Sequence, residues 1–172
     1  GVGMRWLILS FGGAGLLRPA PGTWGSLAAV IVAWPLHLLG GPYALGAAAL
    51  LCYFVGLELV KKEIASRGDH DPSWVVIDEA VGQWLALIPV SAGAIVSGAS
   101  FLALWPGIVS AFVFFRLFDV RKPWLVGRAD RRGDAVGVMM DDVWAGVFAA
   151  IVVMVLAALA HAGFVDAVPD RS

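Results

Sequence analysis

Two pairs of adjacent carboxylates stand where long uncharged runs of this sequence begin. Asp78-Glu79 precedes residues 80–115 and Asp141-Asp142 precedes residues 143–165, and neither run contains Asp, Glu, Lys or Arg. A carboxylate at the edge of an apolar segment is costly unless it is paired, bound to a metal or facing water. The helix dipole stabilises one acid at a helix N-terminus, but two exceed what capping needs. We therefore expect each pair to serve a metal site or catalysis.

A third group of charges closes one of these runs. Arg116 and Asp119 are three residues apart, so they are neighbours on one face of a helix. They can simply pair with each other at the edge of the apolar run. Alternatively, Arg116 holds a phosphate through its planar fork of donors while Asp119 binds a cation. Lys122 would then add to the neutralisation of the phosphate.

The glycine-rich segment 12–26 offers hydroxyl donors just before an expected helix. Thr23 and Ser26 are its hydroxyl residues, and the free N–H groups of a helix N-terminus favour anions. The segment lacks the Gly-Lys-Ser/Thr ending of a nucleotide-binding P-loop. It can bind phosphate, or it can be an ordinary capped helix start after a proline-rich turn.

The available ligands favour magnesium over zinc. They are hard carboxylate oxygens, with no cysteine and at most one histidine, His70, nearby. Acids, a divalent cation and basic donors together form a phosphoryl-transfer site. At a lipid–water boundary, such a site suits a substrate whose phosphate lies at headgroup depth.

Composition places these residues in a membrane protein. The chain has 172 residues, of which 60% are hydrophobic and 15% charged, and its mean hydropathy is +0.84. Its length fits one domain over residues 1–172. We predict an all-α, polytopic membrane bundle of about five short spans. They are expected at 25–39, 43–61, 79–95, 100–118 and 142–163.

The charges also predict an orientation. Eleven of the twelve Lys and Arg residues fall on one side of this arrangement, and only Arg171 falls on the other. That side should face the cytoplasm. The acids of the proposed site share it, so we expect a cytoplasm-facing polar site. Arg128, Arg131 and Arg132 have the character of anchors for anionic lipid headgroups.

Four segments, in this order, resemble the phosphatidylglycerophosphatase A family. They are Pro-Ala-Pro-Gly-Thr-Trp-Gly-Ser (19–26), Val-Val-Ile-Asp-Glu-Ala-Val-Gly (75–82), Phe-Phe-Arg-Leu-Phe-Asp-Val-Arg-Lys-Pro (114–123) and Gly-Val-Met-Met-Asp-Asp-Val-Trp-Ala-Gly (137–146). The resemblance implies an all-helical, Mg²⁺-dependent phosphatase of the bacterial inner membrane. Such an enzyme converts phosphatidylglycerophosphate to phosphatidylglycerol and phosphate at the cytoplasmic face.

Carried over position by position, the resemblance implies roles for nine residues. The candidate catalytic residues are Asp78, Glu79, Asp119, Asp141 and Asp142, with Asp78, Glu79, Asp119 and Asp142 as metal ligands. The candidate phosphate contacts are Thr23, Ser26, Arg116 and Lys122. Whether a carboxylate or a metal-bound hydroxide attacks phosphorus stays open. The implied partners are an anionic phospholipid substrate and the membrane, without nucleic acid or an obligate protein partner.

Two other functions fit parts of this pattern. A small cation-binding membrane transporter also carries acids in its spans, but here the acids lie at span ends on one side. A lipid phosphotransferase acting on CDP-activated alcohols uses an Asp-Gly spacing near an arginine that this sequence lacks. We therefore favour the phosphatase and keep the transporter as the alternative.

Overall fold

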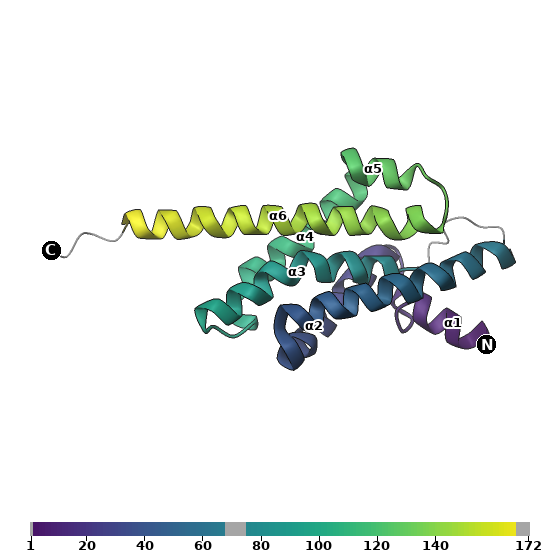
Figure 1. The fold of residues 1–172 in the computed structure, drawn as a ribbon, viewed down its shortest axis with the longest axis horizontal. Helices are drawn as coiled ribbons and strands as arrows, with labels where there is room; N and C mark the ends of the chain where they lie inside the picture. Colours follow the sequence, from purple (N-terminus) through teal and green to yellow (C-terminus); the bar gives the residue numbers. More distant parts are fainter. Residues whose placement is uncertain (1, 68–74, 168–172) are drawn as a thin grey trace.

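The chain is an all-helical bundle, as the sequence predicts. The computed structural model describes residues 2–67 and 75–167, and every regular element within these ranges is a helix (Figure 1). The elements are α1 (Val2–Leu9), η1 (Ala14–Leu16), α2 (Pro21–Arg67), α3 (Ile77–Ser97), η2 (Leu102–Leu104), α4 (Trp105–Arg121), α5 (Trp124–Asp130) and α6 (Ala135–Ala167).

Four helical segments of the described chain are long and apolar enough to cross a membrane. They are Pro21–Ser66, Ile77–Ser97, Leu102–Arg121 and Ala135–Gly163. The expected count of five is not confirmed, because the first two expected spans are the two arms of α2. The backbone of α2 leaves helical geometry at Gly40 (φ −165°, ψ 20°) and Gly41 (φ 59°, ψ −141°). The positive φ of Gly41 is a conformation that glycine adopts without strain.

The first arm of α2 runs parallel to α3. The indole N–H of Trp84 donates to the Ala29 carbonyl at 2.9 Å, and further along both helices His37 Nδ1 lies 2.6 Å from Ser91 Oγ. Because both partners advance together along the chain, the two helices point the same way.

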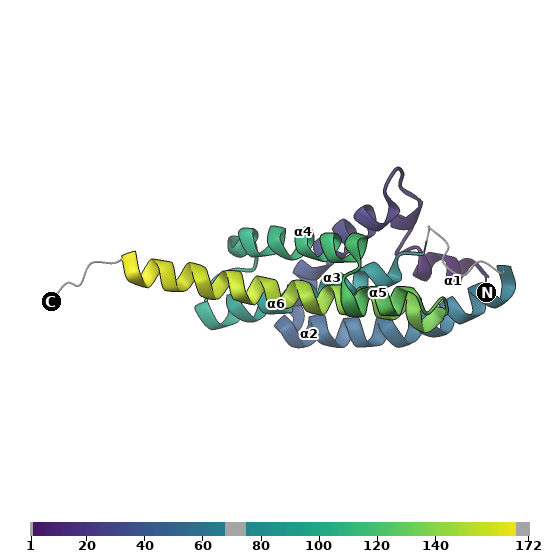
Figure 2. The ribbon, with the colours of Figure 1, turned by 90° about the horizontal axis from the view of Figure 1, so that it is seen from above.

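The second arm of α2 returns in the opposite direction. Gly41 faces Ile95 near the end of α3, whereas Gly56 faces Ile77 at its start. The chain therefore reverses at Gly40–Gly41, and the second arm of α2 passes the N-terminus of α3 near Gly56 and continues beyond it (Figures 1 and 2).

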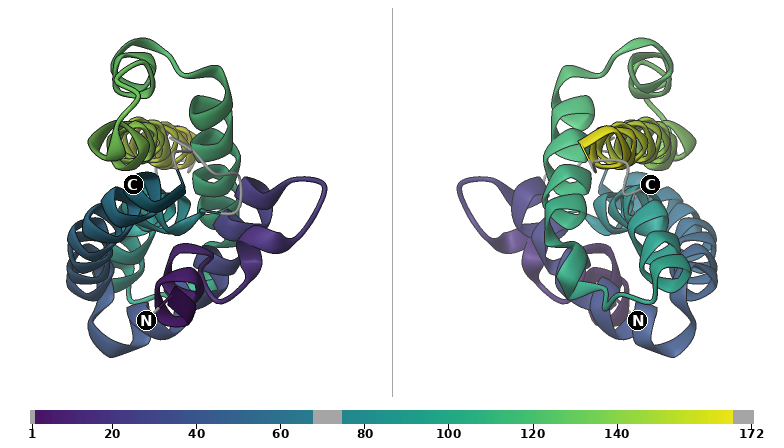
Figure 3. Two further views of the ribbon diagram at one scale, coloured as in Figure 1. Left: turned by 90° about the vertical axis from the view of Figure 1, so that its right-hand side faces the viewer. Right: turned by 90° about the vertical axis from the view of Figure 1, so that its left-hand side faces the viewer.

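Helices α4 and α6 complete the bundle around α3. Gly107 of α4 faces Val90, while Phe115 faces Gly82, so α4 is antiparallel to α3. Gly82 also faces Asp142 near the start of α6. The N-termini of α2, α3 and α6 and the C-terminus of α4 thus meet at one end, which we call the charged end. Figure 3 looks along the bundle and shows α5 beside α6.

Two glycines set the distance between α3 and α6. A Cβ on Gly82 would strike the carbonyl oxygen of Asp142 and approach the Phe115 ring to 2.5 Å. A Cβ on Gly146 would come within 2.9 Å of the Gly82 Cα and also strike its carbonyl oxygen. Small residues allow this close backbone approach between membrane helices. Since Asp78 and Asp142 each lie four residues before one of these glycines, the crossing brings both acids to one place.

Two helices begin earlier than predicted, which changes the setting of several candidate residues. Helix α6 begins at Ala135, not near 142, and the backbone N–H of Gly137 donates to Asp134 Oδ1 at 2.9 Å. This hydrogen bond lowers the pKa of the Asp134 carboxyl, although burial opposes it, with Arg132 adding to the effect. Asp141 and Asp142 therefore lie inside the helix, where capping does not account for them.

The start of α2 also differs from the prediction. The helix begins at Pro21 rather than near residue 25. Proline suits the first turn of a helix because its missing N–H has no partner there. Thr23 and Ser26 consequently belong to the first two turns of α2, not to a loop before it.

The crossing predicts that Gly82→Ala is destabilising. The added methyl group must push α3 away from α6 and Phe115, which we expect to cost about 1–3 kcal/mol of folding free energy. The melting temperature of the purified protein in detergent measures this loss.

Gly46→Ala is the matched control, because a Cβ on Gly46 meets nothing within 4 Å. Alanine is favoured over glycine in a helix by about 1 kcal/mol, so this variant should keep or raise the melting temperature. Equal melting temperatures for Gly82→Ala and the unsubstituted protein would contradict the close crossing.

Candidate active site

Three buried aspartates from α3 and α6 meet at the charged end. Asp78, Asp141 and Asp142 are 7%, 6% and 1% exposed. Each supplies one carboxylate oxygen, and these three oxygens lie within 4.8 Å of one another. Carboxylates this close repel each other strongly unless protons or cations compensate them.

The aspartate cluster has more acceptors than donors. Among the described residues, no hydrogen-bond donor reaches Asp78 Oδ1, Asp141 Oδ1 or either carboxylate oxygen of Asp142. Buried polar atoms in native proteins are nearly always hydrogen-bonded or bound to an ion. Magnesium and calcium prefer sets of carboxylate oxygens such as this one. The cluster can therefore hold a metal ion.

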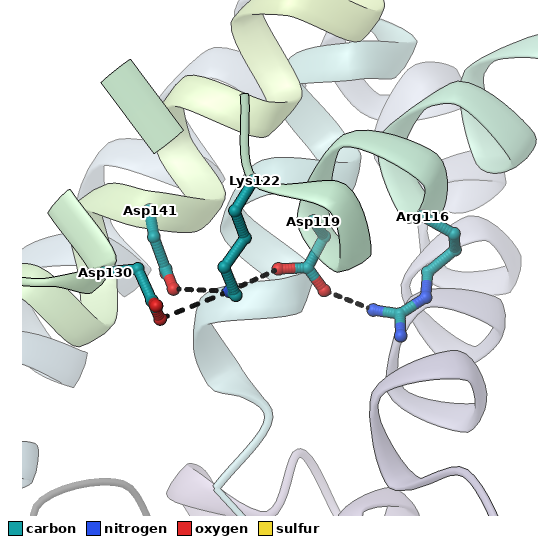
Figure 4. Close-up of polar contacts among 5 residues, drawn as sticks. All are labelled: Arg116, Asp119, Lys122, Asp130 and Asp141. Atoms are coloured by element: carbon teal, nitrogen blue, oxygen red, sulfur yellow. Dashed lines mark hydrogen bonds and ion pairs between the residues drawn. The ribbon is translucent and has the colours of Figure 1, made fainter. Parts of the chain in front are cut away.

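A chain of ion pairs borders this cluster (Figure 4). Lys122 Nζ lies 3.2 Å from Asp141 Oδ2, 3.3 Å from Asp130 Oδ1 and 3.8 Å from Asp119 Oδ1. On its other side, Asp119 accepts from Arg116 Nη1 at 2.6 Å. The pairing of Arg116 with Asp119, one of the two possibilities predicted from their spacing, is thus present in the structure.

Lys122 contributes a fixed positive charge. It follows α4 in the left-handed conformation (φ 52°), and its N–H donates to the Phe118 carbonyl at 2.8 Å. Burial lowers the pKa of its ammonium group, but Asp141, Asp119 and Asp130 outweigh burial and raise the pKa above its usual value. Lys122 is therefore protonated at neutral pH.

The start of α2 forms another wall of the site. A Cβ on Gly22 would lie 3.0 Å from both terminal nitrogens of Arg116 and 3.0 Å from Glu79 Oε1. The first turn of α2 therefore packs its backbone directly on the Arg116 guanidinium and the Glu79 carboxylate. A helix N-terminus beside an arginine is a favourable environment for an anion.

The structure brings most of the predicted site residues together, in two groups. Asp78, Asp141 and Asp142 form the aspartate cluster, which does not include Glu79 or Asp119. The ligand roles expected of Glu79 and Asp119 stay predictions. Asp119, Arg116 and Lys122 form the adjoining ion-pair chain. Glu79 faces Gly22 and Arg116 instead.

Thr23 and Ser26, the two predicted hydroxyl contacts, are buried to different extents. Thr23 is half-buried in the first turn of α2, next to Gly22. Ser26 is fully buried one turn deeper, and its Oγ has no hydrogen-bond partner among the described residues. His70 lies outside the described residues.

Two polar residues of this region were missed in the sequence. Gln83 is fully buried, and neither its amide nitrogen nor its oxygen has a partner in the described part of the chain. Gln83 is the one amide side chain in the uncharged run 80–115, and a lone polar residue in an apolar run indicates a candidate site residue. Asp130 is ion-paired to Lys122, but it lies in an arginine-rich stretch without a motif, so its sequence gave no comparable signal.

Comparison with known proteins identifies one family. The sequence profile of the family described as Phosphatidylglycerophosphatase A matches residues 7–157. A Phosphatidylglycerophosphatase A of Haemophilus influenzae is 37% identical over 145 residues, covering 84% of this chain and 83% of the relative. The protein of that name from Escherichia coli is 32% identical over 154 residues, covering 84% and 79%.

One relative carries a different name. A protein of Bacteroides thetaiotaomicron named Putative phosphatidylinositol-3-phosphatase is 37% identical over 147 residues, covering 83% of this chain and 87% of the relative. No solved structure matches the chain. The profile match and the extent of these similarities show that the chain is a phosphatase of the phosphatidylglycerophosphatase A family.

Proposed function

We propose that this protein hydrolyses phosphatidylglycerophosphate to phosphatidylglycerol and inorganic phosphate, with Mg²⁺, at the cytoplasmic face of a bacterial inner membrane. The observation that carries the proposal is the buried aspartate cluster beside Arg116 and Lys122, in which four carboxylate oxygens have no donor among the described residues. Two relatives with most of their length covered bear the name of this activity.

The reaction breaks the bond between phosphorus and the terminal glycerol oxygen. Water supplies the new P–O bond, and the leaving glycerol oxygen takes up a proton. A bound Mg²⁺ would be held by Asp78, Asp141 and Asp142, and it would supply Lewis-acid stabilisation of negative charge on the phosphoryl oxygens.

The basic residues of the site can neutralise the phosphate charge that a bound Mg²⁺ would leave uncompensated. Arg116 presents a planar fork of donors between Asp119 and the first turn of α2, which fits phosphate oxygens bidentately. Lys122 keeps its proton, so it neutralises charge without acting as an acid. Thr23 adds a hydroxyl donor at the start of α2. Asp119 orients Arg116 through their ion pair, and the Glu79 carboxylate lies near the guanidinium beside Gly22.

The placement of charge supports the cytoplasmic orientation. Most Lys and Arg residues of the sequence lie between the apolar runs or near those ends of the candidate spans that meet at the charged end, as expected for cytoplasmic segments. This end also lies where α3 and α6 begin, so a lipid phosphate at headgroup depth can reach the aspartate cluster. The transporter alternative is disfavoured, since no charged residue continues a path through runs 80–115 and 143–165.

The metal requirement predicts a simple result. Purified protein in detergent should release phosphate from phosphatidylglycerophosphate when Mg²⁺ is present. Removal of divalent ions with EDTA should reduce the rate at least about a hundredfold, because charge on the phosphoryl group then lacks its main stabilisation. Excess Mg²⁺ should restore the rate.

Phosphatidylinositol 3-phosphate is the comparison substrate in this assay, given the name of the Bacteroides relative. Faster hydrolysis of the inositol lipid would overturn the proposed substrate while keeping the phosphatase. Full activity in EDTA would overturn the metal role.

The aspartate cluster predicts the effect of isosteric substitutions. Asp78→Asn and Asp142→Asn each remove one negative oxygen from the proposed metal site, and each should lower kcat/KM at least about a hundredfold. The rate of phosphate release at saturating Mg²⁺ measures this loss.

Asp134→Asn is the matched control, since it changes an exposed aspartate of the same helix start that asparagine can replace as a cap. It should stay within about twofold of the unsubstituted enzyme. Normal turnover in both Asp78→Asn and Asp142→Asn would remove the site assignment.

A further inference from the structure

A pocket rich in arginine lies outside the aspartate cluster. It has a volume of about 630 Å³ and is lined by α5, the start of α6 and Tyr53 of α2. Arg128, Arg131 and Arg132 line it, and no acidic residue does. Arg132 pairs with Asp134, whereas Arg128 and Arg131 have no acidic partner among the described residues.

The basic pocket continues into an apolar groove. Tyr53 and Met140 line both the pocket and a groove of about 330 Å³ between α2, α3 and α6. The remaining groove residues are all apolar. Those of α2 run from Phe54 back to Gly46 along its second arm, and Val81, Leu85 and Val143 line the groove from α3 and α6. Because this arm ends at the charged end, the groove leads from the arginines toward the apolar middle of the bundle.

The pocket opens on a face of α6 that is turned away from Asp142. Met140 and Trp144 line the pocket and are four residues apart, so they share one face. At about 100° per residue, Asp142 projects roughly 200° away from Met140 around the helix. Asp141, the cluster member nearest the pocket, projects roughly 100° away from Met140 and is ion-paired to Lys122. Asp142 faces α3 instead, through the crossing at Gly82.

We propose that this pocket and groove bind one anionic phospholipid of the surrounding bilayer, as a site separate from the catalytic one. The phosphodiester headgroup would lie among Arg128, Arg131 and Arg132, and an acyl chain would lie in the apolar groove. Charge complementarity selects an anionic lipid, since three guanidinium groups line the pocket and, among the described residues, only that of Arg132 is paired with an acid, Asp134. The groove, which lies within the candidate spans, selects a lipid over a free phosphate.

Native mass spectrometry of the full chain in a nonionic detergent tests this site. The probes are phosphatidylserine and phosphatidylcholine with the same acyl chains, in a buffer without Mg²⁺. Neither lipid carries a phosphomonoester, so neither is a substrate of the proposed phosphatase. We expect one phosphatidylserine molecule to bind, with an affinity at least about tenfold higher than that of phosphatidylcholine.

Substitutions then locate the bound lipid. Arg128→Gln with Arg131→Gln should remove the preference for phosphatidylserine, whereas the matched pair Arg18→Gln with Arg121→Gln should keep it. Gly46→Leu, which fills the groove where a Cβ meets nothing within 4 Å, should weaken binding of phosphatidylserine by a factor of about three or more. Glycerophosphoserine, which has no acyl chains, should not compete at equal concentration.

Three results would overturn the proposal. They are an unchanged preference in the Arg128/Arg131 variant, loss of the preference in Asp142→Asn, and equal competition by glycerophosphoserine. The second would place the lipid at the catalytic site and the third would indicate a site for free headgroups. None of them bears on phosphate release from phosphatidylglycerophosphate, so this site and the proposed function fail independently.

Discussion

The close crossing of α3 and α6 is the constraint on which the site depends. Gly82 and Gly146 leave no side chain between the two helices, so their backbones come into contact. The helices run parallel, and each carries an aspartate one turn before its glycine. Asp78 and Asp142 are therefore placed side by side by the same contact that holds the helices together. A larger residue at either glycine would separate the acids as well as the helices.

This placement concentrates negative charge where the apolar spans begin. Lys122 and Arg116 compensate the outer carboxylates, including Asp119 and one oxygen of Asp141. The inner oxygens of Asp78 and Asp142 receive no donor from the described chain. The bundle thus keeps part of its acidic site uncompensated, which is the arrangement that a divalent cation and a phosphate dianion would complete. Around α6, exposed arginines form a separate basic surface with an apolar groove below it.

Much of this organisation could be predicted from the sequence, because the apolar runs and the charges between them are sharply separated. The helical class and the meeting of distant acids at one end follow from this pattern. The start of α6 could not be predicted, because residues 135–140 are apolar but lie outside any run long enough to signal a span. The reversal at Gly40–Gly41 was visible as a turn, yet the packing of both arms against α3 depends on tertiary contacts. Likewise, the sequence could not show that Asp141 belongs to the aspartate cluster and Glu79 does not, because this depends on which side of each helix faces its neighbour.

Direct measurement of divalent-ion binding tests the central claim most closely. Mn²⁺, a paramagnetic substitute for Mg²⁺, can be titrated into the purified protein and followed by electron paramagnetic resonance. We predict at least one bound Mn²⁺ that Mg²⁺ displaces, and loss of this ion in both Asp78→Asn and Asp142→Asn. Undiminished Mn²⁺ binding in both variants would show that these aspartates do not share an ion, and would contradict the account.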